Sequence, residues 1–75
     1  SGLHREREKL VRTLETMQNE LKTYENNLGF LSTSSKKGNS LLNELNRKVE
    51  KLKADIELMK QKIKVLDEKA QDANV

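Results

Sequence analysis

The sequence predicts an all-α fold, an antiparallel two-helix coiled-coil hairpin, with dimerisation to a four-helix bundle as a further option. Three observations lead to this class. Charged residues make up 36% of the 75 residues and Pro is absent, a composition typical of long helices. Apolar residues recur at steps of three and four in both halves of the chain. This pattern stops only once, in a polar stretch near the middle that is rich in Ser, Gly and Lys.

The first helix is expected over about residues 3–28. Its apolar positions alternate steps of four and three, which is the a/d seam of a coiled coil, and one arginine is the only polar member. The seam comprises Leu3, Arg7, Leu10, Leu14, Met17, Leu21, Tyr24 and Leu28.

The turn is expected at about residues 29–39. Gly29 has no Cβ and can take the left-handed conformation that closes a helix, so that Phe30 packs back on Tyr24. Ser40 is expected to cap the second helix, with Asn39 as the alternative, because either side chain can accept hydrogen bonds from free amides. The closed end of the hairpin is expected to be covered by Phe30, Leu31, Leu41 and Leu42.

The second helix is expected over about residues 40–71. A period of 3.5 residues favours helices that wrap around a partner helix over a helix that lies on a sheet. The second seam has no polar interruption and comprises Leu42, Leu45, Val49, Leu52, Ile56, Met59, Ile63, Leu66, Ala70 and Ala73.

The register between the two seams follows from setting a positions of one helix against d positions of the other. Leu28 then faces Leu45, and at the open end Arg7 lies beside Leu66, so the two helices finish together. The central layers are expected to contain Leu14, Met17, Leu21, Leu52, Ile56 and Met59. A register shifted by one heptad would instead place Leu28 against Gly38 and leave the end of the second helix unpaired.

The length allows one small domain, residues 1–75, and we expect it to be a piece of a longer protein because Ser1-Gly2 is a pair that cloning can leave. There is no cysteine, so no disulfide framework and no thiolate chemistry. No apolar run approaches the roughly 20 residues that cross a bilayer. We therefore expect a soluble, cytoplasmic protein with no membrane partner.

The sequence predicts no enzyme. Catalysis needs convergent groups in a shielded cleft, whereas a two-helix hairpin has one narrow seam. The only histidine, His4, precedes Glu8 by four residues, and we interpret it as a solvent-exposed side chain and not as a metal ligand. Catalytic residues, cofactors, metal ions and a small-molecule substrate are all expected to be absent.

Two partner classes stay open. Leu58 and Val65 lie seven residues apart, outside the a/d seam on the d side of the second helix, and form a short second apolar stripe. This stripe predicts a protein contact, either self-association or docking to the rest of a parent chain. The function predicted first is therefore a non-catalytic coiled-coil interaction or scaffold module.

The alternative function is a helical arm that contacts tRNA or another nucleic acid through its turn. The net charge is +3, and four basic residues lie at or near the tip. They are Lys36, Lys37, Arg47 and Lys48. Against this, charges of both signs alternate along both helices at a spacing of four residues, as in Lys53 and Glu57, and aromatic residues for base stacking are nearly absent.

Residues 22–38, with Glu-Asn-Asn-Leu-Gly-Phe at 25–30 as the most specific part, together with the stretch 47–53, carry a family resemblance. The match covers roughly residues 18–68 and resembles the C-terminal helical region of large bacterial proteins built from tandem helical repeats of a domain of unknown function. This resemblance implies a cytoplasmic, charged, non-enzymatic helical protein. A weaker likeness is to the C-terminal coiled-coil arm of valyl-tRNA synthetases, whose turn usually has a Lys-Ala-Pro element, whereas this chain has no Pro.

Overall fold

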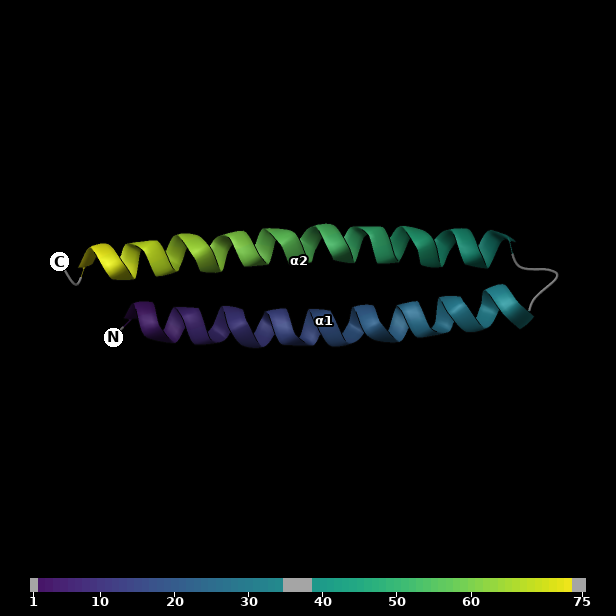
Figure 1. Ribbon diagram of the computed structural model, residues 1–75, viewed down its shortest axis with the longest axis horizontal. Coiled ribbons are helices and arrows are strands. Elements are labelled where there is room, and N and C mark those ends of the chain that lie inside the picture. Colours follow the sequence, from purple (N-terminus) through teal and green to yellow (C-terminus); the bar gives the residue numbers. More distant parts are fainter. Residues whose placement is uncertain (1, 35–38, 74–75) are drawn as a thin grey trace.

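Two long antiparallel helices make up the part of the protein that the structure, a computed structural model, describes. It describes the backbone of residues 2–34 and 39–73 and the side chains of residues 2–32 and 40–72. Helix α1 is Gly2–Ser34 and helix α2 is Asn39–Ala73. They lie side by side with both termini at the same end (Figure 1), in a rod with extents of 60 × 15 × 13 Å. The predicted all-α helical hairpin is confirmed.

The core is a thin seam that is deepest in the middle of α2. Val49, Leu52 and Ile56 are only 4–9% exposed, because the partner helix and the neighbouring turns cover them. The other predicted seam residues with described side chains are half-buried, apart from the exposed Arg7. The half-buried members are Leu3, Leu10, Leu14, Met17, Leu21, Tyr24, Leu28, Leu42, Leu45, Met59, Ile63, Leu66 and Ala70. Two helices therefore shield their shared side chains on some sides only.

One contact between the helices at the open end shows which register they adopt. Arg7 Nε on α1 donates a hydrogen bond to Asp67 Oδ1 on α2 at 2.6 Å, although the two residues are 60 positions apart. Asp67 follows Leu66, the residue that the first register places beside Arg7. The register shifted by one heptad would move Asp67 about 10 Å along the rod, at 1.5 Å per residue, and out of reach of Arg7.

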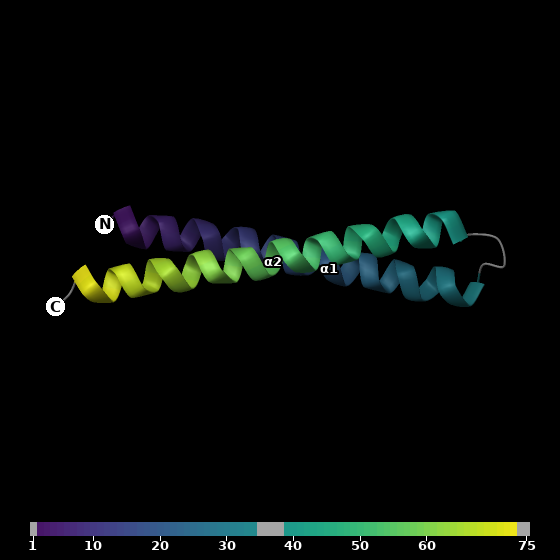
Figure 2. The ribbon, with the colours of Figure 1, turned by 90° about the horizontal axis from the view of Figure 1, so that it is seen from above.

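The two helices cross with a left-handed sense. In Figure 2, which looks down on α2, this helix runs from lower left to upper right in front of α1, and α1 runs from upper left to lower right. A seam that repeats every 3.5 residues drifts around a straight helix of 3.6 residues per turn, and left-handed wrapping keeps the two seams in contact.

The predicted end of the first helix was wrong. Helix α1 runs through Gly29 to Ser34, and Gly29 does not take a left-handed conformation, since no described glycine has a positive φ. The a/d pattern continues one step further to Leu31, which is half-buried, so packing of Leu31 outweighs the low helix propensity of glycine. In the added turn, Ser32 Oγ donates a hydrogen bond to the Gly29 carbonyl at 2.9 Å.

The predicted apolar cover of the closed end is also only partly present. Leu31 and Leu42 are half-buried, but Phe30 is 70% exposed and Leu41 is 49% exposed. Helix α1 continues beyond Gly29, so the chain does not turn back at this point and Phe30 stays largely exposed.

Helix α2 begins one residue earlier than predicted, at Asn39, so Ser40 and the alternative cap, Asn39, both lie inside the first turn and neither precedes the helix as a cap does. The residue before the helix and the predicted tip residues, Lys36 and Lys37, lie outside the described residues. At 33 and 35 residues, both helices are longer than the sequence pattern indicated.

Candidate functional site

The predicted stripe on α2 forms one wall of a groove between the helices. Leu58 is 62% exposed and Val65 is 47% exposed, and both side chains line a hollow of about 550 Å³. Leu10 of α1 and Leu66 of α2 are half-buried seam residues that also line it. The complete lining is Glu6, Leu10, Leu58, Gln61, Lys62, Val65, Leu66 and Lys69. The groove is thus an apolar strip bounded by charged and polar side chains.

Sequence reasoning found Leu58 and Val65 but missed the two other apolar members. Leu10 and Leu66 were assigned wholly to the seam between the helices. A two-helix seam leaves the outer edges of such side chains uncovered, and here those edges extend the stripe onto α1. Leu66 directly follows Val65 in the sequence, and this adjacency could have indicated that Leu66 borders the stripe.

All the large apolar residues that are exposed in the described part of the chain share one side of the hairpin. In the heptad numbering set by the seams, Phe30, Leu58 and Val65 occupy c positions and Leu41 occupies a g position. The g positions of the two helices face each other across an antiparallel coiled coil, and c positions flank them. We call this side the c/g side; it carries these four exposed apolar residues among charged and polar side chains.

Three threonines on α1 reduce the polarity of the same side. Thr13, Thr16 and Thr23 occupy g or c positions, and each donates its hydroxyl proton to the carbonyl four residues earlier at 3.0–3.1 Å. Their hydroxyl donors are therefore used within the helix, as is common for threonine in helices. The middle of the c/g side is accordingly less polar than its sequence suggests.

The predicted basic cluster at the turn is only partly described. Arg47 is exposed on the outside of α2, and Lys48 is exposed at a g position, on the c/g side. Lys48 Nζ lies 3.9 Å from Glu44 Oε1, so an acidic neighbour offsets part of its charge. Since Lys36 and Lys37 lie outside the described residues, the structure does not test whether the four cations form one surface.

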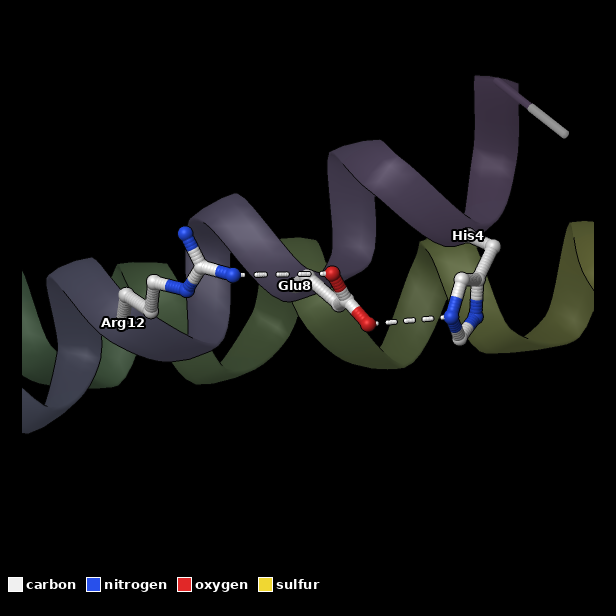
Figure 3. Close-up of polar contacts among 3 residues, drawn as sticks. All are labelled: His4, Glu8 and Arg12. Atoms are coloured by element: carbon white, nitrogen blue, oxygen red, sulfur yellow. Dashed lines mark ion pairs between the residues drawn. The ribbon is translucent and has the colours of Figure 1, made fainter.

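His4 takes part in a row of polar contacts along α1 and not in a convergent site. Glu8 Oε1 lies 3.0 Å from His4 Nε2, and Glu8 Oε2 lies 3.7 Å from Arg12 Nη2. Figure 3 shows the carboxylate between its two neighbours along the helix, with one oxygen toward each. Within the described residues, no group of three or more His, Cys, Asp and Glu side chains could hold a metal ion.

The other ion pairs of the described residues join side chains one turn apart on α2, and all their members are exposed except the half-buried Asp55. Lys51 Nζ lies 2.9 Å from Asp55 Oδ2, and this hydrogen bond, followed by the charge of the carboxylate, raises the pKa of Lys51 above 10.5. Lys53 does not pair with Glu57, the neighbour four residues on, but with Glu50 at 3.9 Å. Glu57 pairs with Lys60 at 3.5 Å. In both of these pairs the glutamate precedes the lysine, the order that the helix dipole favours.

Comparison of the chain with protein-family models, curated proteins and solved structures gives no significant match. The two likenesses described above therefore stay predictions. Neither described helix contains a stretch long and apolar enough to cross a membrane. The candidate site rests on the geometry of the groove alone.

Proposed function

We propose that this hairpin is a non-catalytic protein-interaction module that self-associates through the c/g side. The observation that carries the proposal is the groove, in which Leu58 and Val65 are 62% and 47% exposed and continue the apolar surface of two seam residues. An amphipathic helix laid into such a groove buries apolar area with no need for a cleft. Association of two hairpins would give a four-helix arrangement with a wider core.

The energetics favour a weak, concentration-dependent complex. Chains of this size rarely gain more than about 3–5 kcal/mol from one core, so further apolar burial would add a large fraction to their stability. Burying Leu58 and Val65 in both copies supplies roughly 4–8 kcal/mol, at about 1–2 kcal/mol for each partly buried aliphatic side chain. Association itself costs about 4–15 kcal/mol in lost freedom, so the surplus is small. The largest surplus that these figures allow is about 4 kcal/mol, which corresponds to a dissociation constant of about 1 mM, so we expect dissociation constants in the millimolar range.

Sedimentation equilibrium from micromolar to millimolar protein tests the proposal. The wild-type mass should rise above that of the monomer, and Leu58→Lys should keep the protein monomeric. Gln18→Lys is the matched control, because it adds the same charge at an exposed e position on the opposite side of the hairpin. Circular dichroism should show the same helix content for all three. A monomer mass for the wild type throughout, or equal association of the Leu58→Lys variant, would contradict the proposal.

The nucleic-acid alternative is separated by titrating labelled tRNA and single-stranded RNA at two salt concentrations. We expect no saturable binding. Tight binding that weakens steeply with salt and is lost when Lys36 and Lys37 are both changed to Glu would overturn the preference for a protein partner. The proposal also includes a cytoplasmic location, with which the absence of cysteine is compatible.

A further inference from the structure

The c positions of α2 form a row with a distinctive order of chemistry. One c side chain follows another every seven residues, or about 10.5 Å along the helix. From Lys51 onward the row reads base, apolar, apolar, acid: Lys51, Leu58, Val65 and Asp72. When the row is read in the opposite direction, the base and the acid exchange places, and so do the two apolar residues. It is therefore complementary to its own antiparallel copy.

An α2 helix from a second molecule, laid antiparallel along the groove, satisfies all four positions at once. When Leu58 of one copy lies opposite Val65 of the other, Lys51 falls opposite Asp72, because both pairs are centred between residues 61 and 62. A two-fold axis at this point repeats each contact, as a symmetric interface requires. Each dimer then contains two leucine–valine layers flanked by two lysine–aspartate pairs.

The neighbouring g positions fit the same arrangement. Asp55 of one copy lies within one residue, about 1.5 Å along the helix, of the position opposite Lys69 of the other, because this pair is centred on residue 62, and its charges are again opposite. Lys62 lies at the two-fold axis and meets its own symmetry mate, but Glu6 of α1 lines the same groove and supplies negative charge there. The charges thus support one geometry at positions outside the apolar row.

The parallel arrangement is disfavoured by the same residues. Pairing Leu58 with Leu58 would set Lys51 against Lys51 and Asp72 against Asp72, and like charges placed opposite each other repel. The order of charges along the helix therefore selects the direction of the partner, as charged flanking positions do in coiled coils.

We infer that the groove binds helix α2 of a second copy of this chain, antiparallel about a two-fold axis between residues 61 and 62. This rests on the proposed self-association and adds its partner helix, direction and register. The two α2 helices lie in contact at the centre of the resulting four-helix bundle, and each lies in the groove of the other molecule. The turn ends of the two hairpins project in opposite directions.

Introduced cysteines test the register directly, since the chain has none of its own. Gln61 lines the groove beside the axis, so Gln61→Cys should form a disulfide-linked dimer under mild oxidation at millimolar protein. Gln18→Cys, exposed on the opposite side, is the control and should stay largely monomeric. A mixture of Lys51→Cys and Asp72→Cys proteins should cross-link to each other in preference to themselves.

Charge exchange tests the direction. Asp72→Lys should raise the dissociation constant of the dimer about 5- to 30-fold, the effect expected when two exposed ion pairs become repulsive. The double variant Lys51→Asp with Asp72→Lys should restore it to within about threefold, with helix content checked by circular dichroism. If the protein dimerises but these variants cross-link and associate like the controls, the register is wrong and self-association stands. If the wild type stays monomeric at millimolar concentration, both fail together.

Discussion

Replacing Gly29 by Ala is predicted to stabilise the protein. Gly29 is exposed in the interior of α1, its φ is not positive, and a Cβ added there meets nothing within 4 Å. Glycine in a helix interior costs about 0.8–1.0 kcal/mol relative to alanine, chiefly because it loses more backbone freedom on folding. Since the site lies within six residues of the helix end at Ser34, where helices fray, we expect a gain of about 0.5–1 kcal/mol.

Urea unfolding followed by circular dichroism, at a protein concentration low enough to keep the hairpin monomeric, measures this gain. The midpoint should rise while the slope with denaturant stays the same. Gly2→Ala is the control, because it also places a Cβ in open space but at the first residue of α1, where a change of a few tenths of a kcal/mol is expected. A loss of about 1 kcal/mol or more on Gly29→Ala would refute the reasoning, because that is the cost of alanine in a left-handed helix stop.

Two further predictions follow from burial and charge. Ile56→Ala deletes three carbon groups from a residue that is 5% exposed, and Leu58→Ala deletes three from a residue that is 62% exposed. At about 0.8 kcal/mol per group, scaled by the buried fraction, Ile56→Ala should cost at least about 2.3 kcal/mol and Leu58→Ala about 0.9 kcal/mol in the monomer. Equal losses of unfolding free energy would contradict the burial pattern. The ammonium of Lys51 should titrate above pH 10.5 by NMR, and Asp55→Asn should lower its pKa toward 10.5. Because the folded pKa is raised, the contribution of this pair to stability is complete below pH 10.5 and is lost as the pH rises through the folded value. An unchanged titration in Asp55→Asn would show that Asp55 does not cause the shift.

The candidate site was predicted in part. Leu58 and Val65 were visible in the sequence because they are apolar at a spacing of seven residues outside the seam. Their neighbours Leu10 and Leu66 were not, because a heptad pattern assigns each residue to one face, whereas a large side chain at the edge of a thin seam contributes to two. The charged residues that select the direction of the proposed partner helix are also visible in the sequence. Only the position of the groove shows that they flank it.

The sequence by itself determined the class of fold, the a/d seams and the register, because a period of 3.5 residues and an antiparallel return leave few ways to pair the apolar positions. The hydrogen bond of 2.6 Å from Arg7 Nε to Asp67 Oδ1 agrees with that register. Only the tertiary structure decided where α1 ends and how deeply each layer is buried. The helix continues through Gly29 because Leu31 still packs at the seam, a contact that no local propensity includes. Burial is deepest at Val49, Leu52 and Ile56 because it depends on how much of each side chain two crossing rods can cover, and the helices cover most near the middle of α2.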